Sequence, residues 1–410
     1  MMVRFELKKV LGKTSSKITL LIWAGLILIG SLLAINGVEW TDEQGQQQQG
    51  HAAVMKLREA QKQWSGPLDE ETLTQVILEN QRIEATPEAN SQDTQQRNIA
   101  FGWKQGIYEI WWLMNYAYAD GFQSMDAYVA DRVTVDMVSQ FYLNRVKLLR
   151  DWLYDESNEA YSLFSEQEKQ FLLQQYEQIE TPFQYDYWGG WNQAMYQSFL
   201  PIAMGALVLT FLVVGFFSDE FRWKADAIYF SSQYGRTKAT AAKIKAALLL
   251  ITGLYWLGIG VYTAVILGYL GADGGGCPIQ ISIWKCFYNW KIWQVYLIAV
   301  VLGYIGTLFF VLLTMWVSAK TKSAVFSVTI PFILILLPSM LENLSTSVDK
   351  VIGLLPDRLL QVTQCIRYFD VYSIGQKSFG ALHLLPWIYL ALIALLIPAL
   401  YLEFRRKQIT

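Results

Sequence analysis

Six long apolar runs, each free of Asp, Glu, Lys and Arg, constrain the fold of this chain more than any other feature. A helix needs about 20 apolar residues to cross a bilayer core of about 30 Å. One charge at the centre of such a helix costs about 2.5–3.5 kcal/mol on an insertion scale. The runs cover residues 18–38, 199–217, 246–270, 292–319, 324–341 and 384–402. They predict an all-α membrane protein with about six transmembrane helices.

The first and the fifth run differ from ordinary spans in their surroundings or their content. The first is longer than the apolar core of a signal peptide and no small-x-small cleavage pattern follows it, so we expect a retained anchor. The fifth is shorter and holds Pro331 and Pro338, so a kinked or re-entrant segment competes with a full span there. The composition agrees with a membrane protein, since 53% of the residues are hydrophobic and 17% are charged.

Lysine and arginine are concentrated in the segments that would lie on one side of a six-helix arrangement. The positive-inside rule therefore places both termini in the cytoplasm of a multi-pass protein in the cell (plasma) membrane. On that side we expect an interfacial helix at residues 1–17, a connecting segment at 218–245 and a tail at 403–410. On the extracellular side we expect residues 39–198, 271–291 and 342–383, the last of them with short helices.

The first extracellular segment, residues 39–198, is long enough to be a domain. Between residues 39 and 195 it carries 25 acidic and 11 basic side chains. It begins with a low-complexity QGQQQQG linker at residues 44–50 and continues with helix signals. Leu73, Val76 and Ile77 share one helical face, and Ser165 with Glu168 forms a capping box. We expect a mainly helical, acidic extracellular domain.

Aromatic residues are abundant in this domain, and Tyr187, Trp188 and Trp191 come just before the second apolar run. Aromatic rings build cores and also collect at membrane interfaces. A core together with an interface belt therefore explains them. The alternative is an aromatic surface that grips a peptide or a lipid.

Motifs that carry enzymatic chemistry are absent from the sequence. It contains no G-x-x-x-x-G-K-[ST] phosphate loop, no H-E-x-x-H and no G-x-S-x-G. Two His and three Cys offer few ligands for zinc, and the apolar runs lack the charges of a proton relay. We expect no catalytic, cofactor or metal site in this chain. A formal net charge of −2 also gives no reason to expect a nucleic-acid partner.

Three cysteines fall in segments predicted to be extracellular, where thiols that meet tend to oxidise. Cys277 and Cys286 share one short loop, and Cys365 lies in the next extracellular loop. A Cys277–Cys286 disulfide is the first prediction. A Cys286–Cys365 bridge competes with it, and three unpaired thiols are the remaining alternative.

The connecting segment at 218–245 is far longer than a turn between two spans requires. Ala227, Ile228, Phe230 and Tyr234 fall near one helical face, and Gly235 follows as a stop. The sequence predicts an amphipathic helix here. One interpretation is a purely interfacial helix whose basic residues lie on anionic lipid.

A second interpretation of this segment comes from resemblance. The order of the spans, the large insert after the first span, and S-S-Q-Y-G-R-T-K followed by A-A-K-I-K-A-A-L-L resemble the permease subunits of ABC-2 type ABC transporters. In that family the connection is a coupling helix that docks on a separate ATPase subunit. The matching positions here are Ser232, Gln233, Tyr234, Gly235, Arg236, Lys238 and Lys243. Relatives commonly carry an acidic residue and Gly-Thr just upstream, where this chain has Trp223-Lys224-Ala225-Asp226.

The resemblance implies a permease subunit of an ATP-driven exporter that moves an amphipathic substrate such as a peptide, an antimicrobial or a lipid. Its partners would be an ABC ATPase subunit, which binds the ATP, and a second permease subunit in a homo- or heterodimer within the lipid bilayer. Gly253, Gly258, Gly260, Gly303 and Gly306 would allow close helix approach. The alternative function is a membrane receptor or assembly factor that senses an extracellular ligand through the acidic domain.

Overall fold

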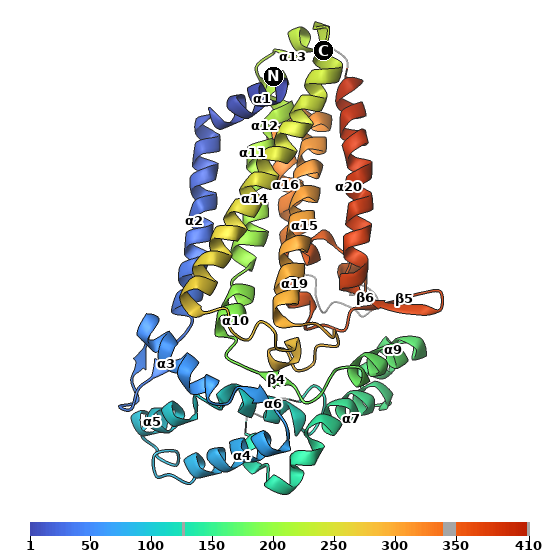
Figure 1. Cartoon of the computed structure of the whole chain (residues 1–410). Helices are drawn as coiled ribbons and strands as arrows, with labels where there is room; N and C mark the ends of the chain where they lie inside the picture. The colour runs from blue at the N-terminus through green and yellow to red at the C-terminus, as the bar shows by residue number, and fades with distance from the viewer. Residues whose placement is uncertain (125–127, 339–349, 408–410) are drawn as a thin grey trace.

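The computed structural model describes residues 1–124, 128–338 and 350–407, and this part of the chain is mostly helical. Long apolar helices form a bundle, the domain inserted after the first span lies at one end of it, and both termini lie at the other (Figure 1). We call these the insert end and the termini end. Residues 339–341 of the fifth predicted span, 342–349 of the following loop and 408–410 of the tail fall outside the described residues.

Five helices in the described part are long and apolar enough to cross a membrane. They are α2 (Thr14–Asn36), the run Gly189–Arg222, the run Gly235–Leu270, α15 (Ile292–Thr321) and α20 (Ala381–Arg405). The predicted fifth span contains α16 (Ala324–Leu336), whose 13 residues are shorter than a bilayer crossing. The membrane-protein class is therefore supported with five candidate spans and one shorter apolar helix among the described residues.

Two of the candidate spans are built from several helical pieces and extend beyond the charge-free runs. The first comprises α10 (Gly189–Tyr196), a π-helical turn η3 (Leu200–Met204), α11 (Gly205–Val213) and α12 (Gly215–Arg222). The second comprises a π-helical turn η4 (Gly235–Ala239) and α14 (Thr240–Leu270). At the termini end the extensions carry charged residues. Hydropathy alone could not assign these residues to the helices.

The bundle is organised around α15, which packs against α11, α16 and α20, while α2 packs against α11 and α14. Helices α2 and α14 approach closely at Gly258, where an added Cβ would collide with Trp23 and Ile27. Gly303 and Gly306 are equally crowded by neighbouring side chains. Close approach is thus confirmed at these three glycines. Gly253 and Gly260 make no such approach within the chain, since nothing lies within 4 Å of a Cβ added at either.

The insert domain forms a compact helical body with short paired strands. Its elements are β1 (Trp40–Thr41), β2 (Gln47–Gln48), α3 (His51–Lys62), β3 (Gly66–Pro67), α4 (Glu70–Glu84), α5 (Thr94–Lys104), α6 (Tyr108–Ala117), η1 (Ala130–Arg132), η2 (Val135–Gln140), α7 (Phe141–Tyr154), α8 (Glu159–Leu163), α9 (Glu166–Glu177) and β4 (Gln184–Tyr185). Leu73, Val76 and Ile77 are buried in its core, as predicted. The predicted capping box of Ser165 and Glu168 begins α9.

The glutamine-rich stretch at 44–50 is not a free linker, and that prediction is wrong. Strands β1 and β2 pair antiparallel around it, with Trp40 opposite Gln48. The Asp42 carboxylate accepts hydrogen bonds from the backbone N–H groups of Gln44 and Gln46. Gly45 has a positive φ of 75°, which favours glycine at the tip of such a turn. Turn chemistry therefore orders a segment whose composition suggested a linker.

Two further segments lie at the insert end and pack on the insert domain. They contain η5 (Ile279–Ile281), η6 (Pro356–Leu359), α19 (Val362–Cys365) and the antiparallel hairpin β5 (Val371–Ile374) and β6 (Lys377–Gly380). The guanidinium of Arg145 on α7 is buried and donates to the carbonyls of Trp284 at 3.2 Å and Cys286 at 2.9 Å. Lys350 pairs with Glu168 at 3.0 Å. The domain and both segments therefore form one end of the molecule.

All three cysteines belong to the described residues, and none forms a disulfide in the structure. The predicted Cys277–Cys286 bridge is absent, and the backbones of the two residues bind different partners. The Cys277 carbonyl accepts from the Ile292 N–H, while the Cys286 carbonyl accepts from Arg145. All three thiols are buried, and burial raises the pKa of each to about 12. The arrangement present is the alternative of three unpaired thiols.

Candidate functional site

The segment that resembles a coupling helix lies at the termini end, beside the end of α20 (Figure 1). After α12 the chain turns at Lys224, which has a positive φ of 54°. It then forms α13 (Asp226–Ser231), a short exposed stretch at 232–234, and the π-helical turn that begins α14. The helix predicted here is therefore only six residues long. Gly235 begins the next helical run rather than ending this one.

The predicted apolar face of this helix is divided in two. Phe230 is 4% exposed and packs inward, whereas Ile228 is 76% exposed and Tyr234 is 42% exposed. A glycine is required at position 235, because a Cβ added there would collide with the Tyr229 carbonyl oxygen. The segment thus has one aromatic contact to the bundle and one apolar group that faces outward.

The inward contact is an aromatic cluster around Phe404 in the last turns of α20. The Phe404 ring lies 4.5 Å from Phe217, 5.2 Å from Phe230, 5.6 Å from Tyr229 and 6.1 Å from Phe221, measured between ring centroids. Phe404 itself is fully buried. The cluster joins α12, α13 and α20, so a displacement of α13 acts directly on two membrane helices. Sequence patterns did not reveal it, because Phe404 follows the last charge-free run.

Arg236, one of the predicted coupling residues, binds within its own chain. Its Nη1 donates to the carbonyl of Arg405 at 2.9 Å and to that of Lys407 at 2.7 Å. Its Nε donates to the Phe230 carbonyl at 3.2 Å. The last carbonyls of a helix have no partner inside it and carry a partial negative charge. Arg236 therefore caps the end of α20 and fixes α13 to it.

Lys243, another predicted coupling residue, is completely buried. Its Nζ lies 2.7 Å from Glu220 Oε1, 2.8 Å from the Phe216 carbonyl and 3.7 Å from Glu6 Oε2. Lys9 also pairs with Glu220 at 2.7 Å. These pairs tie α14 to α12 and to α1 (Met2–Leu11), which packs on α14 instead of lying free of the bundle. Lys243 is an internal anchor of this end.

The remaining predicted residues stay at the surface. Ser232, Gln233, Tyr234 and Lys238 are all exposed, and the Lys238 ammonium lies 4.4 Å from the centre of the Tyr234 ring. Together with the exposed Ile228 they form a small patch with apolar, amide, hydroxyl and cationic groups, which we call the segment surface. Among the described residues, no group of three or more His, Cys, Asp or Glu is placed to hold a metal ion.

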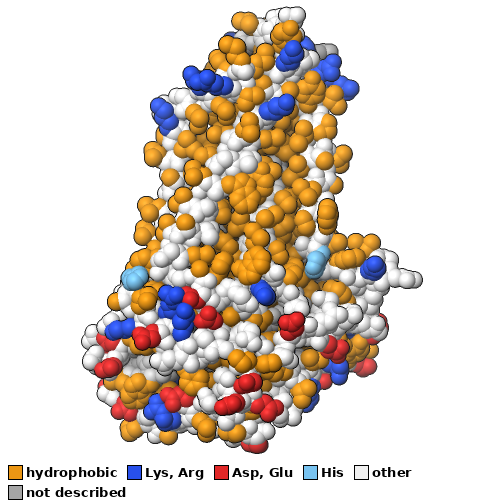
Figure 2. All heavy atoms as spheres, viewed as in Figure 1, with side chains coloured by type: hydrophobic (Ala, Val, Ile, Leu, Met, Phe, Trp, Pro, Cys, Tyr) orange, Lys and Arg blue, Asp and Glu red, His pale blue; other side chains and the backbone are white. Residues whose placement is uncertain are grey.

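Charged side chains divide between the two ends of the molecule. In the view of Figure 2, lysine and arginine are prominent around the termini end, and red acidic side chains appear only at the insert end. The acidic residues Glu6, Asp219, Glu220 and Asp226 do lie at the termini end, but each is buried, and the partly exposed Glu403 pairs with Lys407 at 3.2 Å. The exposed charge at that end is therefore mainly basic. Comparisons with family models, with curated proteins and with solved structures find no match to this chain.

Proposed function

We propose that this chain is the transmembrane permease subunit of an ATP-driven ABC exporter of the ABC-2 type, with its energy supplied by a separate ATPase subunit. The observation that carries the proposal is the segment surface. It is exposed, it lies between two candidate spans, and the residues next to it are fixed to three membrane helices. A docked partner that moved this surface would move the bundle.

The charge distribution supports an orientation with the termini end in the cytoplasm. Exposed lysine and arginine at that end follow the positive-inside bias of membrane proteins (Figure 2). The insert domain would then be extracellular in the cell membrane. An ATPase subunit in the cytoplasm could reach the segment surface directly.

The mechanism follows from the contacts around α13. Force on the segment surface would pass through Phe230 to Phe404 and so to α20, and through Arg236 to the end of the same helix. The Lys243–Glu220 pair would carry it into α12 and α14. Rigid-body tilting of packed helices is a common form of such transitions. Two permease chains, identical or paired with a similar subunit, would form the pathway for an amphipathic substrate such as a peptide, an antimicrobial or a lipid.

Co-purification tests the proposal. The full chain is extracted from its native membranes in a mild detergent, and the bound proteins are quantified by mass spectrometry. We expect an ATPase subunit at about one copy per permease chain. Lys238→Glu reverses the charge of the segment surface without touching the cap made by Arg236, so it should remove the ATPase while the permease still inserts.

Lys17→Glu is the matched control, because Lys17 is exposed near the start of α2 at the same end of the bundle. It makes the same charge change away from the segment surface and should retain the ATPase. A wild-type chain that brings down no nucleotide hydrolase would overturn the proposal and favour the alternative of a receptor or assembly factor. Equal retention in both variants would remove the segment surface as the docking site.

A further inference from the structure

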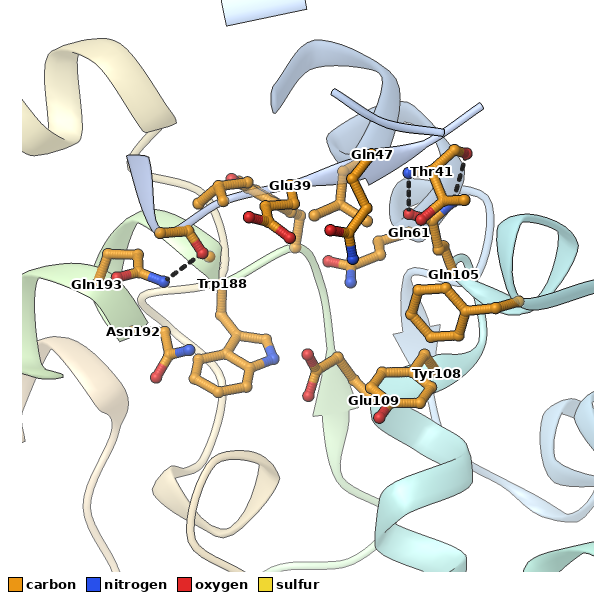
Figure 3. Close-up of a pocket in the computed structure, with 16 residues that line it drawn as sticks. Glu39, Thr41, Gln47, Gln61, Gln105, Tyr108, Glu109, Trp188, Asn192 and Gln193 are labelled. Carbon is orange, nitrogen blue, oxygen red and sulfur yellow. Dashed lines mark hydrogen bonds between the residues drawn. The ribbon is translucent and has the colours of Figure 1, made fainter. Parts of the chain in front are cut away.

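A cavity of about 270 Å³ lies where the insert domain meets the bundle. Its walls come from the stretch between α2 and β1, from α3, from α6 and from the start of α10 (Figure 3). Binding pockets are often found where two structural units meet. A cavity of this volume has room for a small head group rather than for a whole peptide.

The lining combines aromatic rings with amide groups and carboxylates. Figure 3 shows the Glu109 carboxylate pointing into the space between the rings of Trp188 and Tyr108. The second carboxylate, that of Glu39, accepts a hydrogen bond from Gln49. Among the described residues that line the cavity there is no lysine, arginine or histidine. The cavity is therefore acidic.

Cations close to the cavity are engaged elsewhere. Arg58 and Lys62 on α3 both pair with Asp273, each at 2.6 Å. Lys104 on α5 pairs with Glu84 at 2.9 Å and Asp131 at 3.2 Å. Within the described part of the chain, Glu109 forms no ion pair and no hydrogen bond through its carboxylate. Its desolvation raises the pKa of Glu109 to about 7.

Two further acceptors in the lining lack partners. The Tyr187 hydroxyl belongs to a side chain that is 0% exposed, and it makes no hydrogen bond in the structure. The Gln193 amide donates its Nε2 hydrogen to the Gly37 carbonyl, while its buried Oε1 accepts nothing. Buried polar atoms without partners cost free energy. Both atoms are closed to solvent, so they lie behind the surface of the cavity, and the Glu109 carboxylate is the group that a ligand can reach.

We propose that this cavity binds the primary ammonium group of an organic amine, with the Glu109 carboxylate as its counter-charge and the rings of Trp188 and Tyr108 beside it. A cation is attracted to aromatic faces, most strongly to Trp, when water is excluded. A primary ammonium group carries three donors, which suit the two oxygens of the Glu109 carboxylate. A quaternary ammonium has no donor and could not hydrogen-bond to that carboxylate.

This site is independent of the segment surface, which lies at the opposite end of the bundle (Figure 1). It would serve an exporter that receives or releases a cationic amphiphile, and it would serve a receptor equally well. Loss of ATPase binding in the co-purification experiment would therefore leave this inference standing. Loss of amine binding would likewise leave the proposed function standing.

Calorimetric titration of the purified full chain at pH 8 tests the inference. The probes are hexylamine, tetramethylammonium and hexanol. We expect hexylamine to bind at one site per chain, with tetramethylammonium weaker and hexanol weaker still. Glu109→Gln removes the charge at nearly constant shape and should weaken hexylamine binding by about tenfold to a hundredfold, as expected for loss of a charge-assisted hydrogen bond.

Glu43→Gln is the matched control, because Glu43 is exposed in the β1–β2 hairpin outside the cavity lining. It should leave hexylamine affinity unchanged. Trp188→Leu should weaken binding while Trp188→Phe retains most of it, and thermal unfolding of each variant shows that the fold persists. Equal affinity for hexanol and hexylamine, or unchanged affinity in Glu109→Gln, would overturn the inference.

Discussion

The ammonium nitrogen of Lys243 lies 2.7 Å from a carboxylate oxygen of Glu220, and the lysine side chain is fully buried. The first residue belongs to α14 and the second to α12. Their pairing joins the two helices on either side of the connecting segment. Lys9 pairs with the same carboxylate and adds α1 to the junction. This buried junction fixes the frame from which the segment surface projects.

Replacement of Lys243 should therefore destabilise the bundle more than it affects any partner. Lys243→Met leaves the buried Glu6 without its cation and Glu220 with Lys9 alone. Breaking a buried pair typically costs about 3–5 kcal/mol, and the remaining Lys9 pair places the expected loss near the lower value. The measurement is thermal unfolding of the full chain in detergent.

Lys245→Met provides the control, because Lys245 is exposed two residues further along the same helix. It should change the melting temperature little. The double variant Lys243→Met with Glu6→Gln should recover part of the loss, since Glu6 is the buried carboxylate that Lys243→Met leaves without a cation. Equal melting temperatures for the two lysine variants would contradict the role of this junction.

Arg236 should act on the C-terminal helix through its cap. In Arg236→Gln the carbonyls of Arg405 and Lys407 lose their charged donor. A cation at a helix C-terminus contributes about 0.3–1 kcal/mol, and up to about 2 kcal/mol when partly buried. Hydrogen exchange at residues 403–407 should therefore become several-fold faster. Lys238→Gln is the control, because Lys238 lies two positions from Arg236 but does not bind the end of α20. It should leave the exchange rate at residues 403–407 unchanged. Faster exchange in both variants would argue against a specific cap.

Periodicity and turn chemistry predicted much of the fold because these signals are local. Leu73, Val76 and Ile77 lie three or four positions apart, so one helical face carries them wherever that helix packs. The capping box of Ser165 with Glu168 is equally local. Charge-free length likewise identified the long helices. Charge-free length did not predict the helix ends that carry charge, because α12 and α14 continue past the apolar runs.

The candidate site was predicted less well, because its contacts join residues distant in sequence. Arg236 binds Arg405 at the end of α20, 169 positions away in the sequence, and Lys243 binds Glu220, which is 23 positions away. A basic residue beside an apolar run has the same local pattern whether it faces a partner or a buried carboxylate. Only the folded arrangement separates Lys238, which is exposed, from Lys243, which is not.

Arg145 should control how tightly the segment with Cys286 is held to the insert domain. Arg145→Met would leave the Trp284 carbonyl without its side-chain donor, at a cost of about 1–3 kcal/mol, and the Cys286 carbonyl with the Gln280 amide alone. Burial raises the pKa of the Cys286 thiol to about 12, so the wild-type protein should react slowly with a maleimide at pH 8. The variant should react many-fold faster at this cysteine, as peptide mapping by mass spectrometry would show.

The control for this change is Arg150→Met on the same helix, where an exposed arginine pairs with Glu177 at 3.3 Å. That surface pair contributes little, so the labelling of Cys286 should match the wild type. The same mapping on denatured, unreduced protein should find all three cysteines labelled. A Cys277–Cys286 peptide pair resistant to labelling would show that the bridge forms after all.

Stability should depend on pH through Glu109. Its pKa is raised from 4.5 to about 7 because the carboxyl is desolvated. Below 4.5 the group is protonated in both folded and unfolded chains and has no effect on the free energy of unfolding. Between pH 4.5 and about 7 the unfolded chain loses this proton while the folded protein keeps it, so the free energy of unfolding falls over that range and stays low at higher pH, where the folded protein holds a desolvated charge.

Glu109→Gln removes that charge and should therefore raise the melting temperature by a few degrees at pH 8 and much less at pH 5. The neighbouring groups Glu39, Arg58, Tyr185 and Tyr187 are present in both proteins. Comparison with Glu43→Gln, an exposed carboxyl in the same domain, isolates the contribution of burial. A shift in melting temperature that is the same at both pH values would mean that the variant acts through packing. Hexylamine added at pH 8 should reduce the difference in melting temperature between the wild type and Glu109→Gln, because it stabilises only the protein that keeps its carboxylate.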